Sequence, residues 1–211
     1  MTIAHIMLDL ETWGTQPGCD IRSIGAVVFD PVKNLVAIPD GDNAELQFYI
    51  ACKNENDKTS WKGQIKPRII PGLKYQLTRD PQTVKWWNEQ SPEAQAAFAN
   101  PVDLREACYS FGKWIVKIMY DDGAHTEQPT LKIWANGPQF DISILEAVYH
   151  AVKLPVPWHY RAPRDFRTIT DAAGMTRDEF SNYGDAHNAL HDAIAQAMTV
   201  CEAYKRLGLR K

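Results

Sequence analysis

The sequence predicts an α/β fold in which helices cover a mixed central sheet. Three strand-like segments come first, over 3–10, 22–30 and 46–52, and helix-like and strand-like segments then alternate to the end of the chain. This order of elements is typical of a sheet with helices packed against its faces.

The length and composition fit one domain. The chain has 211 residues, of which 45% are hydrophobic, and a chain of this size buries roughly 70% of its unfolded surface. We expect a single domain over 1–211, with a polar loop insertion around 53–79 that shows little periodicity. The net charge of −3 argues against a protein that coats nucleic acid non-specifically.

The first strand ends in two carboxylates. Asp9 closes the apolar run from Ile6 to Leu8, and Glu11 lies two positions further on. If the strand continues, its period of two places both side chains on the same side. At about 4 Å apart they would repel by roughly 1 kcal/mol in water and more when buried, so the pair needs a cation or a shared proton. An acidic, solvent-exposed strand end is the alternative, because D-x-E alone carries little information.

Three helices are expected in the middle of the chain. Asp80-Pro81 and Ser91-Pro92 each combine an N-cap residue with proline at the first helical position. Trp86 and Trp87 are adjacent on the first of these helices, so at most one ring faces fully inward. From Leu104, apolar residues at helical spacing predict a third helix packed against the sheet; they are Cys108, Phe111, Ile115 and Ile118.

A third carboxylate follows the next strand. The segments 131–135, 136–138 and 140–152 are typical of a buried strand, a turn and a helix, and they place Asp141 in the first turn of that helix. An acid in this position is ordinarily explained by the helix dipole. In open α/β sheets, however, ligands gather at the carboxyl ends of strands, where Asp141 can meet the acids of the first strand.

The last predicted elements are a short strand near Phe166 and a C-terminal helix that carries Asp192. Residues five apart on a helix lie roughly 140° apart around its axis, so His187 can face the same site as Asp192 only from the preceding loop. This placement makes Asp192 a rigid ligand and His187 a mobile group suited to a general base. We assign His191, adjacent to Asp192, to the helix surface or to a packing contact.

Together these side chains indicate a nuclease. Two-metal phosphoryl-transfer chemistry needs several carboxylates for two divalent cations and a nearby base for water. Asp9, Glu11, Asp141 and Asp192 supply the carboxylates, and His187 supplies the base. We therefore expect two Mg²⁺ or Mn²⁺ ions as cofactors.

The order of these motifs resembles the DEDDh branch of the DEDD 3′-to-5′ exonucleases. A D-x-E strand, an F-D at a helix start and an H-x4-D at the last helix occur in that order, and the stretches LDLETWGT, WWNEQSPEA and WANGPQFDISILEAVYHA are especially similar to the ribonuclease T-like exonucleases. The sister branch has a tyrosine four positions before the last aspartate, where this chain has Asn188. The resemblance runs from Ile3 to about Tyr204 and implies a ribonuclease H-like fold, with three antiparallel strands and then parallel strands.

The resemblance also implies a role for each residue of the site. Asp9 would bridge both metals, Glu11 and Asp192 would complete the shell of the first, and Asp141 would support the second. His187 would deprotonate the attacking water, and the product would be a nucleoside 5′-monophosphate.

Substrate contacts are expected around the carboxylates. Exposed aromatic rings hold single-stranded bases without sequence preference, and among the seven tryptophans we expect Trp13, which follows the D-x-E pair, to stack on the terminal base. The other expected contacts are Leu10, Thr12, Phe140 and Arg167. Two basic groups either bind phosphate or form solvated surfaces; they are Arg161, Arg164 and Arg167, and Lys62, Lys66 and Arg68.

The expected partner is the 3′ end of single-stranded RNA or DNA, and the resemblance implies a homodimer. The four cysteines have no C-x-x-C pairing, which indicates neither a zinc site nor a disulfide framework and favours a cytoplasmic location. No apolar stretch approaches the ~20 residues of a membrane span, and the N-terminus does not resemble a signal peptide. A phosphodiesterase for small nucleotides and a catalytically inactive nucleic-acid-binding module remain alternatives.

Overall fold

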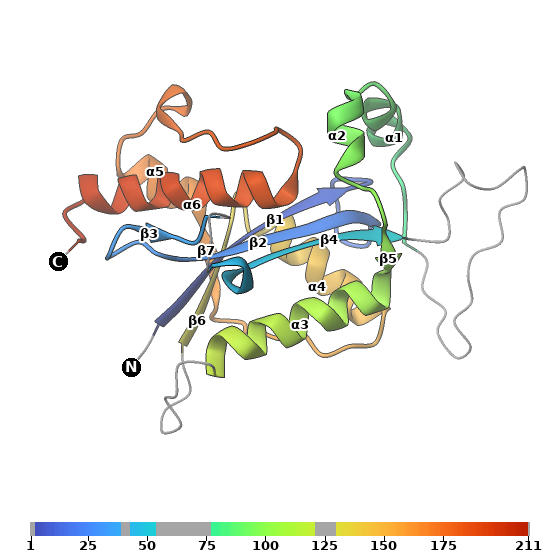
Figure 1. Ribbon diagram of the computed structural model, residues 1–211, viewed down its shortest axis with the longest axis horizontal. Coiled ribbons are helices and arrows are strands. Elements are labelled where there is room, and N and C mark those ends of the chain that lie inside the picture. The colour runs from blue at the N-terminus through green and yellow to red at the C-terminus, as the bar shows by residue number, and fades with distance from the viewer. Residues whose placement is uncertain (1–2, 39–42, 54–76, 121–129, 211) are drawn as a thin grey trace, which may run out of the picture.

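A mixed sheet runs through the middle of the protein, with helices on both faces (Figure 1). The computed structural model describes residues 3–38, 43–53, 77–120 and 130–210. The strand order is β5-β4-β2-β1-β6-β7, and β3 pairs with β2 outside this path. The strands are β1 (Ile3–Thr12), β2 (Ile21–Asp30), β3 (Leu35–Val36), β4 (Gln47–Lys53), β5 (Val102–Asp103), β6 (Thr130–Ala135) and β7 (Pro163–Asp165).

The strand directions confirm the predicted fold class. β1, β2 and β4 pair antiparallel, whereas β6 runs parallel to both β1 and β7. At the other edge, β5 pairs parallel with β4, a contact that the sequence analysis did not anticipate. β3 and β5 were missed because two-residue strands carry no periodic signal.

The helices form two layers and one projecting pair. The longer helices are α3 (Leu104–Tyr120), α4 (Asp141–Ala151) and α6 (Ala189–Arg206). The shorter ones are α1 (Pro81–Asn88), α2 (Pro92–Ala96), α5 (Phe166–Ala172) and the 3-10 turns η1 (Ala44–Leu46) and η3 (Arg177–Glu179). In Figure 1, α6 crosses one face of the sheet and α3 and α4 lie on the other, while α1 and α2 stand beyond the ends of β1 and β2.

Local sequence signals placed most helix starts correctly. Asp80 and Ser91 accept the backbone N–H of Thr83 and Ala94, respectively, as the predicted N-caps of α1 and α2. Near Phe166 the chain does form a short strand, but β7 ends at Asp165 and Phe166 begins helix α5, which was not predicted. Of the polar insertion predicted around 53–79, residues 54–76 lie outside the described residues, and so do Lys62, Lys66 and Arg68.

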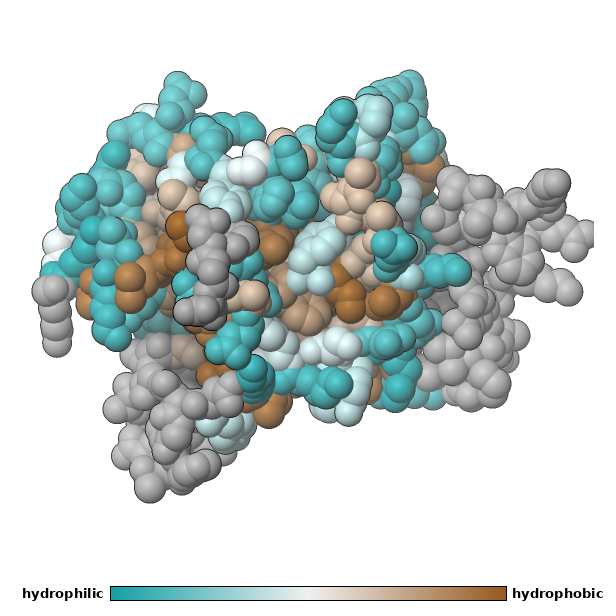
Figure 2. Space-filling model, in the orientation of Figure 1, coloured by the Kyte–Doolittle hydropathy of each residue, from teal (hydrophilic) through white to brown (hydrophobic). Residues whose placement is uncertain are grey.

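Each face of the sheet has its own apolar core. Ile6, Leu8 and Leu10 of β1 pack with α3 and α4, whereas Met7 packs with α5 and α6. Figure 2 shows a largely hydrophilic surface over α6 and the α1–α2 pair, with hydrophobic patches between α6 and α3. None of the helices among residues 3–38, 43–53, 77–120 and 130–210 is long and apolar enough to cross a membrane.

Candidate active site

The acidic pair lies on the α6 face at the end of β1. The strand continues to Thr12, as the predicted pairing of Asp9 with Glu11 required. Leu8 and Leu10 enter the core under α3 and α4, so alternation places Asp9 and Glu11 on the opposite face. The side-chain amide of Gln196, on α6, donates to Asp9 Oδ1 over 2.8 Å and confirms this orientation.

A glycine in β2 lets α6 approach the acids. Gly25 pairs with Asp9 across the β1–β2 ladder. A Cβ atom added to Gly25 would lie 2.1 Å from the backbone carbon of Ala189, the first residue of α6. Only a residue without a side chain fits there, so Gly25 permits the close contact that brings the start of α6 over the carboxylates.

Asp141 reaches the site from the start of α4. Helix α4 follows the carboxyl end of β6 through a turn in which Gly137 has φ +100°. The backbone N–H of Leu10 donates to Asp141 Oδ1 over 3.2 Å. This hydrogen bond ties the third acid directly to the strand that carries the first two.

His187 lies in the loop before α6, as predicted, and faces the same site as Asp192. Its φ of +63° is in the left-handed region, which non-glycine residues adopt rarely. Its backbone N–H donates to Asp192 Oδ2 over 3.2 Å. One possible ligand atom from each of Glu11, His187 and Asp192 lies within 4.8 Å of the others.

Burial raises the pKa of all four acids, and repulsion from neighbouring acids adds to the rise at Asp9 and Glu11. Asp9 has a pKa well above the usual aspartate value, first because of burial and then because of the charges of Asp141, Glu11 and Asp192. Burial, with repulsion from Asp192, raises the pKa of Glu11 to about 8, although the nearby Arg22 opposes the shift. Burial raises the pKa of Asp141 to about 7 against the Leu10 hydrogen bond, and it also raises the pKa of Asp192.

These side chains fit divalent cations. Four carboxylates and one histidine form an oxygen-rich donor set of the kind that Mg²⁺ and Mn²⁺ prefer. Their raised pKa values show that the nearby positive charges of Arg22 and Arg167 do not offset the burial of the ionised acids. Gln196 Oε1 is buried beside them without a hydrogen-bond partner in the described part of the chain. Asp9, Glu11, Asp141 and Asp192 would hold the cations.

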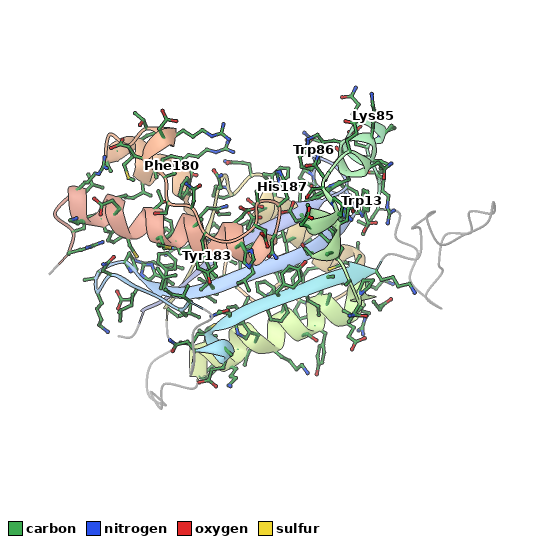
Figure 3. All side chains as sticks on the ribbon, turned by 45° about the horizontal axis from the view of Figure 1, so that its top comes forward. Trp13, Lys85, Trp86, Phe180, Tyr183 and His187 are labelled. Atoms are coloured by element: carbon green, nitrogen blue, oxygen red, sulfur yellow. The ribbon has the colours of Figure 1, made fainter. Side chains whose placement is uncertain are left out.

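The α1 helix forms the opposite wall of the site. Trp87 is 2% exposed and its indole N–H donates to the Thr12 carbonyl over 2.8 Å, which fixes α1 to the end of β1. Trp86 is 41% exposed, and its ring meets the His187 ring edge-on at 4.9 Å between centroids. The prediction that at most one of the two rings faces inward is confirmed, and the outer one lies against His187 (Figure 3).

Comparisons with known proteins identify the family of this chain. Residues 4–204 match the model of the 3′-5′ exoribonuclease Rv2179c-like domain. The chain belongs to this exoribonuclease family. The predicted relationship to the 3′-to-5′ exonucleases is thereby confirmed, and the protein is a phosphodiester hydrolase by family. No curated protein matches the chain.

Solved structures of exonuclease I share the fold of this exoribonuclease domain. A product-bound exonuclease I has 15% sequence identity and a TM-score of 0.56, covering 100% of this chain and 44% of that one. E. coli exonuclease I with a dT13 oligonucleotide has 14% identity and a TM-score of 0.58, covering 99% and 42%. The zinc-bound E. coli exonuclease I–ssDNA complex has 16% identity and a TM-score of 0.55, covering 100% and 41%. The chain thus spans less than half the length of these proteins.

The exoribonuclease domain does not expose Trp13, so the expectation of an open stacking surface there is wrong. Trp13 is 9% exposed, and the guanidinium carbons of Arg22 and Arg79 each lie 4.5 Å from its ring centroid. The Asp80 backbone N–H donates to the Trp13 carbonyl, because the chain entering α1 folds back onto the end of β1. Trp86 is the exposed aromatic ring at this site.

Two further expected contacts are buried in the domain. Leu10 is 4% exposed and its side chain belongs to the core, while its backbone N–H is used by Asp141. Thr12 is 7% exposed, and its hydroxyl donates to the Gly14 carbonyl. Their side chains therefore support the strand end rather than present a surface to substrate.

Phe140 and Arg167 lie beside Asp141. Phe140 is the residue before α4 and is partly buried against the core. Arg167 is exposed; its Nε donates to Asn136 Oδ1 over 3.0 Å, and its charge opposes the rise in the pKa of Asp141. In the same basic group, Arg164 donates to the carbonyl oxygens of Arg161, Ala162 and Pro163, so it stabilises the local chain.

His191 makes the packing contact that was one of its two predicted placements. Its Nδ1 accepts the backbone N–H of Asp185 over 2.9 Å, and its ring packs against Gly184 and Tyr183. This contact supports the loop that carries His187.

Gln196 and Trp86 are the site residues that sequence reasoning missed. Gln196 lies one helical turn beyond Asp192, a spacing that could have drawn attention to it.

Proposed function

We propose that this domain is a metal-dependent 3′-to-5′ exonuclease that hydrolyses single-stranded nucleic acid to nucleoside 5′-monophosphates. The observation that carries the proposal is the convergence of four carboxylates from β1, α4 and α6 with a loop histidine. A structural role would not require four carboxylates with raised pKa values to lie together, since burying acids costs stability. A site that holds divalent cations does require such a cluster of carboxylates.

The positions of these side chains support a two-metal mechanism. Two cations, when bound, would neutralise charge on the scissile phosphate and the departing 3′ oxygen. Asp9, Glu11, Asp141 and Asp192 would hold these cations through their carboxylate oxygens. Gln196 would hold Asp9 in orientation through its amide.

His187 would act as the general base. It lies in the loop before α6, and one of its ring nitrogens is within 4.8 Å of a carboxylate oxygen of Glu11 and of Asp192. The base must be neutral to accept the proton. The edge-on contact with Trp86 would keep the ring directed toward the carboxylates.

Single-stranded RNA is the first substrate to test. The family to which the chain belongs is one of exoribonuclease domains, whereas two of the exonuclease I structures are complexes with dT13 or ssDNA. Trp86 is the side chain that we propose for stacking on the terminal base, because it is exposed beside His187. The cytoplasmic location and the homodimer remain predictions, which fractionation and the molar mass in solution would check.

The decisive experiment compares matched 5′-labelled RNA and DNA oligonucleotides with Mg²⁺, Mn²⁺ or EDTA. The proposal expects a ladder that shortens from the 3′ end, releases nucleoside 5′-monophosphates and stops in EDTA. Hydrolysis of a chromogenic phosphodiester without shortening of the oligonucleotides would favour a small-nucleotide phosphodiesterase. Binding of oligonucleotides without hydrolysis under any metal condition would favour an inactive binding module.

A further inference from the structure

A groove leads away from the carboxylate site between α5 and α6. Its cavity volume is about 980 Å³, and it begins at Asp192 and Gln196. The segment after η3 forms its outer wall, which contains Phe180 and Tyr183. In Figure 3, Phe180, Tyr183 and His187 lie along this segment, and Trp86 lies on the other side of His187. We call this feature the α5–α6 groove.

The groove carries guanidinium groups suited to phosphate. Arg167 lines it near the carboxylates, where Asn136 Oδ1 holds its side chain over Gly137. Arg177 lines it further along; it is exposed and makes no ion pair with any residue in the described ranges. Asp171 and Asp178 also line the groove, so it would make a few discrete phosphate contacts rather than act as a uniformly basic channel.

The position of the groove indicates which part of the strand it can hold. An exonuclease acting at a 3′ end has one nucleotide on the 3′ side of the scissile phosphate and the rest of the strand on its 5′ side. The volume of about 980 Å³ lies at the upper end of the roughly 300–1,000 Å³ that small-molecule sites occupy, and the lining runs from Asp192 and Gln196 as far as Arg177. Trp86 and α1 border the other side of the catalytic centre.

We infer that the α5–α6 groove binds the strand on the 5′ side of the scissile phosphate, with Arg167 and Arg177 contacting successive phosphates. The inference rests on the proposed exonuclease function and adds a polarity to it. The terminal nucleotide lies toward Trp86, and the remaining strand passes Asp192 and Gln196 into the groove. Arg177, the more distant arginine, contacts only substrates longer than a dinucleotide.

The test compares Arg177→Gln with wild type on single-stranded oligonucleotides of two to eight nucleotides. We expect kcat/KM of the variant to fall about 10-fold more on the octanucleotide than on the dinucleotide. The plot of log affinity against log salt for the octanucleotide should become shallower. The magnitude of its negative slope should fall by about 0.7, the value for one lost phosphate contact on a single strand. Arg177→Lys should restore that slope, because it keeps the charge.

Arg105→Gln is the matched control, because Arg105 lies on α3 beyond the opposite face of the sheet. It should change neither the length dependence nor the salt slope. Equal losses for Arg177→Gln on short and long substrates, or an unchanged salt slope, would overturn the groove assignment. If the wild-type protein releases no mononucleotides, the exonuclease proposal fails instead, and the salt dependence of oligonucleotide binding still tests Arg177.

Discussion

The two faces of the sheet use the same strand for opposite purposes. On the α3–α4 face, β1 contributes Ile6, Leu8 and Leu10, all at most 4% exposed and packed among apolar side chains. On the α6 face it contributes Met7 to a core and then Asp9 and Glu11 to a cluster of acids. The strand period of two therefore places the stabilising side chains of Ile6, Leu8 and Leu10 on one face of this ten-residue strand and its acids on the other.

The difference between the faces has an energetic consequence. Burial of Leu8 favours the folded state, since removing apolar surface from water is stabilising. Burial of ionised Asp9 and Glu11 opposes it, because each loses hydration and repels the other acids. Apolar burial on the α3–α4 face offsets the free-energy cost of burying the acids until cations bind. Substitutions on the two faces should consequently produce opposite combinations of activity and stability.

The largest contrast is expected between Asp9→Asn and Leu8→Ala. Asp9→Asn should lower kcat/KM by at least ~10³, or about 4 kcal/mol of transition-state stabilisation. It should leave the melting temperature measured in EDTA unchanged or higher, since it removes a buried charge. Leu8→Ala should reduce the free energy of unfolding by about 2–5 kcal/mol while the surviving folded fraction keeps its kcat. Nearly normal turnover of Asp9→Asn would refute the two-metal proposal.

A slightly smaller loss is expected at the base. His187→Ala should lower kcat by roughly 10²–10⁴ and leave calorimetric Mn²⁺ binding close to wild type, because the carboxylates provide most of the metal affinity. His191→Ala is the control; it removes the acceptor for Asp185 N–H and should alter kcat by only a few-fold. If His191→Ala is the more damaging change, the base lies on the helix rather than in the loop.

Gln196→Leu tests whether the α6 face positions its acids through a second layer of contacts. The substitution removes the amide that donates to Asp9 Oδ1. Loss of such a supporting hydrogen bond typically lowers metal affinity by about 10- to 100-fold, and we expect a loss of that size here. Isothermal titration with Mn²⁺ measures this directly. Thr199→Val, one turn further along α6, breaks the hydrogen bond to Ser181 N–H and should lower the melting temperature without weakening Mn²⁺ binding.

Trp86→Ala tests the wall opposite α6. One base-stacking contact is worth about 1–3 kcal/mol, so KM for single-stranded oligonucleotides should rise on the order of 10-fold. Trp13→Phe is the comparison, since Trp13 is covered by Arg22 and Arg79 and should affect stability more than KM. A KM that is unchanged in Trp86→Ala would remove this residue from the substrate site.

The smallest predicted effect is a pH dependence of stability in EDTA. Glu11 and Asp141 have pKa values of about 8 and about 7 in the folded protein, above the ~4 of unfolded chains. The folded state therefore binds more protons, and stability falls as pH rises from about 5 to about 8. His5, with a pKa lowered to about 4 by burial, acts oppositely below about pH 6.5. Thermal melts between pH 6.5 and 8.5 isolate the carboxylates.

Mn²⁺ and a single substitution sharpen this measurement. Cations bind the ionised acids, so Mn²⁺ should raise the melting temperature more at pH 8 than at pH 6.5. Glu11→Gln should flatten the pH dependence in EDTA, because it removes a group whose pKa is about 8. A melting temperature that rises with pH across this window would show that the acids are not buried in the unliganded protein.

Features that depend on near neighbours in the chain were determined by the sequence alone. The strand period assigned Asp9 and Glu11 to one side, the N-caps Asp80 and Ser91 fixed the starts of α1 and α2, and helix geometry placed His187 in a loop. These conclusions needed only the backbone repeat and the chemistry of helix ends. The resemblance in motif order identified the full set of five candidate site residues, which are Asp9, Glu11, Asp141, His187 and Asp192.

Features that depend on distant partners were decided only by the tertiary structure. Gln196 and Asp9 form a hydrogen bond across 187 positions of sequence, and β5 pairs with β4 through two residues. Trp13 and Trp86 are the same residue type near the same site, yet one is buried and the other exposed, because α1 folds over the end of β1. Local periodicity does not predict which side chains a distant element will cover, because burial depends on how the whole chain packs rather than on one segment.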